Sequence, residues 1–356
     1  MIPFFVPEFT KDMENAAIDA LRNEKFVMGE SVFKFEEEFA RYTGTKFAIS
    51  VNSGNAALQL SLISLGITEK SKVITSTNSF VASANCILMT GAKPVLCDIN
   101  YDDGNIDIKT TNEKPEAIIP VHIYGNPCDF DSIKSVSETH KAPIIEDACQ
   151  AHGATFDHKK VGSIGDVGCF SFYPTKNMTV GGDGGMVTTN NEEIKKQIDS
   201  LRDNGRRTRT EHDKLGFTMR LNTVNAAIGR IQLQTLDEKN KRRRELASLY
   251  KKFLGDDCML DENPKGTSVY HQIIIKHQKR DEIFSHLSKN NIGVAIHYPR
   301  PIHKQPLYEN LGYNLPISEK FSNEVLSMPS FPQLKDDDVK VICEKINEVL
   351  WSKNIK

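Results

Sequence analysis

The stretch FAISVNSGNAALQLSLISLG, residues 47–66 of a chain of 356, contains the pattern that decides the fold class. A strand-like apolar run is followed by a polar turn at residues 52–55 and by an amphipathic helical run that ends at Gly66. Residues 72–99, KVITSTNSFVASANCILMTGAKPVLCDI, repeat the order strand, helix, strand. Strands joined through helices at this spacing predict right-handed βαβ units and a mostly parallel sheet.

Two more short runs, AIIPVHIYG at 117–125 and PIIEDACQ at 143–150, are rich in β-branched residues and flank a helical stretch. They continue the same alternation, and we expect them to join the same sheet. Ligands of such sheets bind beyond the carboxyl ends of the strands. The residues that follow each strand are therefore the candidates for a functional site.

The pattern changes near Thr223. Residues 224–255 predict one long helix or two abutting helices, and the remainder alternates strand-like and helical runs up to a helix at residues 336–351. We therefore predict an α/β protein with a large domain at residues 1–240 and a smaller C-terminal α+β domain at residues 241–356.

Composition argues against several classes of function. The formal net charge of −2 offers no electrostatic attraction to nucleic acid or to an anionic membrane. No apolar run is long enough for a membrane helix, and Pro3, Pro7 and the early acidic residues argue against a signal peptide. The seven cysteines are scattered and contain no C-x-x-C pair, which is typical of a reducing compartment and argues against a zinc ribbon or a disulfide framework. We expect a cytoplasmic protein without a metal site.

Three segments could carry chemistry. In VNSGNAAL, residues 51–58, the turn opens a helix whose free N–H groups can bind an anion, although a helix start without a ligand looks the same. In PIIEDACQAHGA, residues 143–154, Glu146 and Asp147 end a strand, and because side chains alternate only one of them can face a given side. That carboxylate could orient a cation or a protonated ring nitrogen, or it could cap the following turn.

The third segment, CFSFYPTKNMTVGGDGG at residues 169–185, places one lysine between a strand and a glycine-rich loop. Ser171 is on the opposite side of this strand from Phe170 and Phe172, and Lys176 follows five residues later. A single lysine in a turn is ordinarily a surface residue. The glycines match neither a Walker loop nor a dinucleotide fingerprint, which argues against a nicotinamide-dependent oxidoreductase. An anion-binding helix start, a carboxylate, a hydroxyl and an amine together would suit pyridoxal phosphate.

The order of the motifs SGNAAL, SFVASAN, VHIYGNP, EDACQAHGA, FSFYPTKN, GGDGGM, AAIGRIQL and HYPRPIH resembles the sugar aminotransferases of the DegT/DnrJ/EryC1/StrS family. The resemblance runs nearly from end to end and includes MGESVFKFEEEFARYTG close to the N-terminus. It implies the fold of the aspartate aminotransferases, pyridoxal 5'-phosphate as the cofactor, and a homodimer whose active sites are shared across the interface.

Residue roles follow from the resemblance at the matching positions. It implies that Lys176 holds the cofactor as a Schiff base and then moves a proton between the substrate carbon and the cofactor. Asp147 would pair with the pyridine nitrogen and keep it protonated, and Gln150 would contact the ring hydroxyl. Contacts with the phosphate are implied for Ser171, Gly54 and Asn55, and a contact with the ring face for Phe80, which could otherwise serve in helix packing.

The resemblance also indicates residues near the substrate. His297, Tyr298 and His303 match the family's HY-x-x-P-x-H segment, which helps to form the sugar site, although they could otherwise belong to a turn. Arg220 is a candidate for contact with the neighbouring subunit's site or for a structural salt bridge. His152 is expected to be a packed histidine.

Three positions depart from the family pattern. Asn55 stands where threonine is usual, and because both offer a backbone N–H the phosphate contact is not threatened. Asp183 replaces the usual glutamate of the glycine loop. Thr218 replaces the asparagine that commonly reaches the partner subunit's cofactor, which places that contact in doubt.

The implied reaction is a ping-pong transfer of an amino group from an amino acid to a keto sugar. Glutamate is the expected donor and a nucleotide-linked 3- or 4-keto sugar the expected acceptor, with a keto-cyclitol as the alternative. A sugar dehydratase is disfavoured because such relatives carry histidine in place of Lys176. A non-catalytic regulatory relative is disfavoured because Lys176 and Asp147 are both present.

Overall fold

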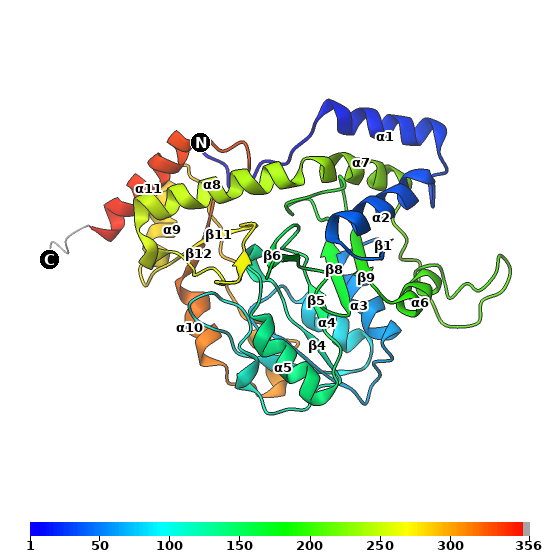
Figure 1. The fold of residues 1–356 in the computed structure, drawn as a ribbon. Coiled ribbons are helices and arrows are strands. Elements are labelled where there is room, and N and C mark those ends of the chain that lie inside the picture. The colour runs from blue at the N-terminus through cyan, green and yellow to red at the C-terminus, as the bar shows by residue number, and fades with distance from the viewer. Residues whose placement is uncertain (352–356) are drawn as a thin grey trace.

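The computed structural model describes residues 1–351, and Figure 1 shows a central sheet covered by helices. The strands of the sheet are β1 (Phe47–Val51), β2 (Lys72–Ser76), β3 (Lys93–Cys97), β4 (Ala117–Ile119), β5 (Ile145–Asp147), β8 (Val167–Ser171) and β9 (Gly185–Thr189). The helices that accompany them are α1 (Lys11–Asn23), α2 (Glu30–Thr43), α3 (Gly54–Ser64), α4 (Ala82–Met89), α5 (Phe130–His140) and α6 (Glu192–Arg202).

Two groups of paired strands form this sheet. One group has the order β1-β9-β8-β5 and the other the order β3-β2-β4. Parallel bridges between Ile118 and Ile144 and between Val121 and Asp147 join β4 to β5. Within this sheet β9 runs antiparallel to both neighbours, and the other pairings are parallel. The prediction of a mostly parallel sheet is therefore confirmed.

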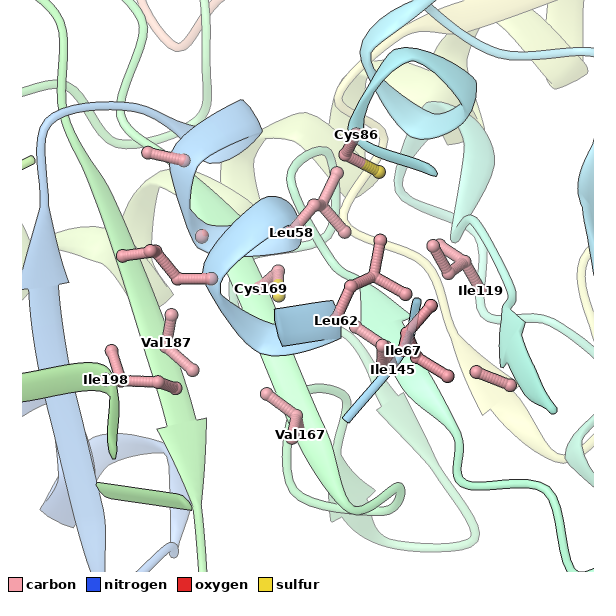
Figure 2. Close-up of a cluster of buried hydrophobic side chains, with 14 of the residues drawn as sticks. Leu58, Leu62, Ile67, Cys86, Ile119, Ile145, Val167, Cys169, Val187 and Ile198 are labelled. Atoms are coloured by element: carbon pink, nitrogen blue, oxygen red, sulfur yellow. The ribbon is translucent and has the colours of Figure 1, made fainter. Parts of the chain in front are cut away.

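Helices pack on both faces of the sheet. On one face, Leu58 and Leu62 of α3 pack against Ile145 and Val187, as Figure 2 shows. On the other face, Phe35 and Phe39 of α2 pack against Phe170 of β8 and Phe172 just after it, with a ring-centroid distance of 5.0 Å between Phe39 and Phe170. The alternation expected along β8 is confirmed, since Cys169 belongs to the core beneath α3 and Phe170 to the core beneath α2.

The C-terminal third forms a second core. Its helices are α7 (Thr223–Gln234), α8 (Leu236–Leu254), α9 (Arg280–Lys289), α10 (Pro316–Glu324) and α11 (Asp336–Leu350), and its antiparallel strands are β11 (Ile273–Lys276) and β12 (Val325–Met328). The second core lies between α8, α9, α11, β11 and β12, whereas α7 packs on α1 and α2. A separate small sheet joins β10 (Gly266–Thr267) to β6 (Thr155–Phe156) and β7 (Lys159–Lys160). The segment at 224–255 is thus two abutting helices, α7 and α8. Residue 240 lies within α8, and the domain boundary placed there from the sequence remains a prediction.

The N-terminal segment lies on the C-terminal third. Ile2 pairs with Ile292 in a parallel bridge, and its N–H donates to the carbonyl of Asn291 at 3.0 Å. Figure 1 shows the N-terminus close to α8 and α11, two helices that lie far from it in the sequence. Among residues 1–351, none of the helices is both long and apolar enough to cross a bilayer.

A buried arginine joins three elements of the large core. Arg202 at the end of α6 is only 3% exposed and forms ion pairs with Glu36 of α2 at 2.5 Å and with Asp199 at 2.7 Å. It also donates to the carbonyl of Ser50 in β1 at 2.6 Å, and Glu36 in turn accepts the N–H of Ser50 at 2.8 Å. Such a pair is costly to break from one side, because the remaining charge stays buried without a partner.

We predict that Arg202→Ala lowers the free energy of unfolding by about 3 kcal/mol, because it leaves the Glu36 carboxylate without its cation. Urea unfolding measures this change. Arg41→Ala, which removes an exposed i,i+4 pair with Glu37, is the control and should have a far smaller effect. An equal decrease in the free energy of unfolding of the two variants would show that the buried ion pair stabilises the fold no more than the exposed one.

Candidate active site

The carboxyl ends of β1, β5 and β8 meet at one edge of the sheet, and α3 begins there. Ser53 caps α3 by accepting the N–H of Ala56 at 3.1 Å. A Cβ atom placed on Gly54 would lie 2.8 Å from both the Sγ of Cys149 and the Cβ of Ser171. The absence of a side chain therefore lets the start of α3 approach the ends of the neighbouring strand segments, with its first backbone N–H groups directed at this edge.

Asp147, at the end of β5, faces α4. Its side chain is 4% exposed, and Ser83 donates to its Oδ2 at 2.7 Å while the N–H of Cys149 donates to its Oδ1 at 3.2 Å. Both carboxylate oxygens thus have a donor, which holds the group in one orientation.

Glu146 points to the opposite side of the strand, as the alternation of side chains requires. It is fully buried and accepts N–H groups from Gly162, Ile164 and Gly165 at 2.6, 2.7 and 2.6 Å. Of the two acids at this strand end, Asp147 is therefore the one on the same side as α3 and α4.

Lys176 lies in the turn after β8 and is half-buried. Burial lowers the pKa of its amine, and the nearby Cys149 and Asp147 act in the opposite direction. The influence of Asp147 on this amine means that the structure brings the lysine and the carboxylate of two different segments together. Lys176 is thus not the fully solvated surface lysine that its position in a turn would suggest.

Gln150 joins this edge to three aromatic residues, Tyr124, Tyr298 and Phe80, which we call the aromatic wall. Its Oε1 accepts the N–H of Tyr124 at 2.8 Å, and its Nε2 donates to the hydroxyl of Tyr298 at 3.1 Å. Burial raises the pKa of Tyr298, so its hydroxyl stays neutral. The ring of Phe80 is 58% exposed with its centroid 6.4 Å from that of Tyr298, and therefore offers a free face beside the wall.

The two histidines of the HYPRPIH segment have different environments. His297 is half-buried, with Nδ1 2.8 Å from the hydroxyl of Ser327, and burial together with Lys176 lowers its pKa to about 4. His303 is 2% exposed, and its ring nitrogens contact Thr77 at 2.7 Å and Glu319 at 3.2 Å. His297 thus lies within the influence of Lys176, whereas both ring nitrogens of His303 already have protein partners. The substrate contacts of both remain predictions.

Arg220 and Thr218 bind within the loop that follows α6. Arg220 forms an ion pair with Asp203 at 2.6 Å, and Thr218 donates to the Oδ1 of Asn204 at 3.0 Å. The salt bridge that was one of the two alternatives for Arg220 is therefore present. Figure 1 shows this loop extending away from the body of the molecule.

Three residues of the site were not selected from the sequence: Ser83, Tyr124 and Cys149. Ser83 lies in the first turn of α4 and its N–H donates to the carbonyl of Phe80 at 3.2 Å, but its side chain is 1% exposed whereas that of Phe80 is 58% exposed. Tyr124 and Cys149 both lie in segments that the motif order had already marked. The missing information was the direction of each side chain, which no local pattern supplies.

A sequence model of the DegT/DnrJ/EryC1/StrS aminotransferase family matches residues 7–347, and the chain belongs to this family. The pleiotropic regulatory protein of Geobacillus stearothermophilus is 36% identical, over 93% of this chain and 92% of the relative. The dTDP-3-amino-3,4,6-trideoxy-alpha-D-glucose transaminase of Streptomyces venezuelae is 34% identical, over 98% and 94%.

The fold is also that of solved members. The crystal structure of S. venezuelae DesV in complex with a ketimine intermediate has a TM-score of 0.93 and 34% identity, covering 96% of this chain and 95% of that one. The expected fold class, that of the aspartate aminotransferases, is confirmed. The activity of the family, transfer of an amino group, is confirmed with it.

Aminotransferases of this family use pyridoxal phosphate, and the residues at the carboxyl edge fit that group. A Cβ on Gly54 would lie 2.8 Å from both Cys149 and Ser171, so the bare backbone at the start of α3 lies directly against these two residues. The amine of Lys176 and the oriented carboxylate of Asp147 face the same edge. This donor set contains each of the groups that the cofactor requires.

We predict that Gly54→Ala weakens the binding of pyridoxal phosphate about tenfold or more, because the methyl group would force Cys149 and Ser171 away from the start of α3. Fluorescence titration of the cofactor-free protein measures the affinity. Gly44→Ala is the control: Gly44 has φ +81° but open space, so this variant should lose stability without losing affinity. An unchanged affinity of Gly54→Ala would contradict the close approach.

A second prediction concerns acid stability. His152 is fully buried between Phe170 and Phe172, with ring centroids at 5.4 and 5.7 Å, and burial followed by Lys176 lowers its pKa to about 3. The unfolded chain binds this proton near pH 6.5 and the folded chain only near pH 3, so the free energy of unfolding falls as the pH drops through this window.

Between pH 7 and pH 4.5, the free energy of unfolding of the unmodified protein should therefore fall by about 2 kcal/mol more than that of His152→Leu. Urea unfolding at a series of pH values measures the slope. The exposed His158, replaced in His158→Asn, is the control and should leave the slope unchanged. Parallel curves for His152→Leu and the unmodified protein would contradict the assignment of a neutral buried histidine.

Proposed function

We propose that this chain is a pyridoxal-phosphate-dependent aminotransferase that takes the amino group of glutamate and transfers it to a nucleotide-linked keto sugar. The observation that carries the proposal is the half-buried Lys176, within the influence of Asp147 at the edge where α3 begins. Family membership supports the transfer reaction, and the cofactor and substrates of this chain are inferred from the residues at the edge.

Four groups of the chain would hold the cofactor. Lys176 would bind it covalently through its amine. Asp147 would accept a hydrogen bond from the protonated ring nitrogen and keep it protonated, while Ser83 and the N–H of Cys149 hold the carboxylate in place. Ser171 and the free N–H groups at the start of α3 would bind the phosphate, helped by the positive end of the helix dipole. The bound cofactor supplies a ring that accepts the electrons released at the substrate carbon.

The same lysine would move the proton. Because burial lowers its pKa, Lys176 reaches its neutral form at a lower pH than a solvated lysine does. A neutral amine can take a proton from the substrate carbon and return it to another atom within reach. The lowered pKa therefore fits the role of general base.

The aromatic wall would receive the sugar. Tyr298 stays neutral because burial raises its pKa, and Gln150 holds its hydroxyl in position. The exposed ring of Phe80, which would contact the face of the cofactor ring, lies beside it with its centroid 6.4 Å from that of Tyr298. His297, whose lowered pKa leaves it uncharged near neutral pH, would add a polar contact for the hydroxyl groups of the sugar.

The choice of acceptor rests on the relatives. The Streptomyces venezuelae transaminase is named for a dTDP-linked amino sugar, which supports a nucleotide sugar over a keto-cyclitol. The Geobacillus stearothermophilus relative is named as a regulatory protein. In the present chain, Lys176 and Asp147 are both retained and the carboxylate of Asp147 is held by Ser83, which supports catalysis over a purely regulatory role.

A homodimer belongs to the proposal. Large apolar side chains are exposed near the carboxyl edge, among them Phe80, Tyr173 and Met89 at 58%, 51% and 54%. Met89 lies against Asn55, with 3.6 Å between its Sδ and the amide nitrogen. A second copy that covered these side chains would also enclose the site, in keeping with active sites shared between subunits.

We predict that the purified protein, incubated with pyridoxal phosphate, gives a visible absorption band that glutamate bleaches. Lys176→Ala should lower the rate of this half-reaction by a factor of about 100 to 10,000, because it removes the group that moves the proton. Stopped-flow absorption measures the rate. Lys159→Ala, which removes an exposed lysine, should leave it unchanged.

Two outcomes would contradict the proposal. One is a protein that remains colourless at saturating pyridoxal phosphate. The other is Lys176→Ala reacting with glutamate as fast as Lys159→Ala does.

A further inference from the structure

The residue that follows Lys176 is bound to the C-terminal third of the chain. Asn177 is 6% exposed, and its Nδ2 donates to the Oδ1 of Asn240 in α8 at 2.9 Å and to the carbonyl of Val269 at 3.1 Å. Its Oδ1 lies 3.2 Å from the Nδ1 of His271. The turn that carries Lys176 is therefore attached to elements far away in the sequence.

Asn240 makes a second bond toward the site. It is 2% exposed, and its Nδ2 donates to the carbonyl of His152 at 2.7 Å. His152 lies at the end of residues 147–152, the segment that starts with Asp147 and contains Gln150. A Cβ on Gly153 would lie 2.9 Å from the same Nδ2, so the close approach of α8 to this segment depends on the glycine. One side chain thus bridges the lysine segment and the aspartate segment.

The orientation of each amide is determined by its partners. Asn240 must direct its NH2 group to the carbonyl of His152, which leaves only its oxygen for Asn177. Asn177 directs its own NH2 group to Asn240 and Val269, so its oxygen faces His271, which must donate through Nδ1. A leucine or an alanine at position 240 makes neither of the two bonds.

Asn240 connects the Lys176 segment to the Asp147 segment beyond the point where the pairing of β5 with β8 ends. The pairing of β5 with β8 ends at Asp147 opposite Cys169, and one further backbone bond, from Ala148 to the carbonyl of Cys169 at 2.9 Å, follows. Beyond that point the strand ladder does not set the distance between the two segments. A displacement of about 1 Å between reacting groups can cost a factor of about 100 in rate.

We propose that Asn240 is a positioning residue that holds the Lys176 segment at a set distance from the Asp147 segment across the cofactor site. The proposal rests on the proposed function, in which these two residues bind opposite parts of one cofactor. It connects α8, which contributes to the C-terminal core and also accepts the hydroxyl of Tyr42 at Asp237, to the segment that carries the reacting amine.

The titratable groups that act on Lys176 and the groups that it acts on come from several segments: Asp147, Cys149, His152, His271 and His297. Burial is the main influence on the amine. If the bridge is lost, the segments separate and water reaches the amine, so its pKa should rise toward that of a solvated lysine. A purely structural role of Asn240 would lower stability and leave this value unchanged.

The test uses Asn240→Leu, with Asn240→Ala as a second variant if the first does not fold. Asn347→Leu is the matched control, because Asn347 also joins a helix to α8 by an amide-to-carbonyl bond, donating to Phe253 at 3.3 Å, but far from the lysine. The cofactor-free proteins are acylated with acetic anhydride over a pH series, and mass spectrometry of the Lys176 peptide gives the midpoint of labelling. Thermal unfolding is recorded for each.

We expect the midpoint of Lys176 labelling to rise by about 0.5 unit or more in the Asn240 variant and to remain unchanged in Asn347→Leu. The glutamate half-reaction of the cofactor-loaded variant should slow by about tenfold or more. An Asn240 variant that loses stability but has the same midpoint as Asn347→Leu would overturn the inference. Because the labelling needs no cofactor, it decides the role of Asn240 even if the unmodified protein fails to bind pyridoxal phosphate, which would contradict only the proposed function.

Discussion

The carboxylate of Glu146 has no exposure to solvent, and its oxygens accept three N–H groups from residues 162–165 while His122 lies 3.2 Å away. A buried charge is tolerated only when its hydrogen-bonding capacity is satisfied, so the loop before β8 must wrap around this side chain. That requirement sets where β8 begins relative to the end of β5. It also requires Asp147, one residue further, to face the opposite side, where α3 and α4 form the site.

The other polar groups at this edge already have protein partners. Ser83 and Cys149 hold Asp147, Tyr124 and Tyr298 hold Gln150, and Asn177 binds Asn240 of α8. The amine of Lys176 and the first N–H groups of α3 would then meet the ligand together with the oriented carboxylate of Asp147 and the hydroxyl of Ser171. Hydrogen bonds from neighbouring residues therefore fix the side chains around the reactive amine, so the site is already in position before a ligand binds.

Much of the architecture could be predicted from local patterns. The alternation of strands and helices predicted the parallel sheet, because each strand was short, apolar and bounded by a turn. The side-chain alternation at Glu146 and Asp147 correctly implied that the two acids face opposite sides. By contrast, neither the pairing of Ile2 with Ile292 nor the ion pair between Arg220 and Asp203 had a local signal, since each depends on how distant segments pack.

By itself, the sequence determined the class of fold, the family and the segments in which the site lies, because each of these depends on short patterns and on their order. Only the tertiary structure decided which side chains meet. Asn240 lies 63 residues after Asn177 and 88 after His152, and it contacts both because α8 packs across the two segments. A hydrogen-bond partner at such a separation is selected by the packing of whole elements, and no pattern within either segment contains that information.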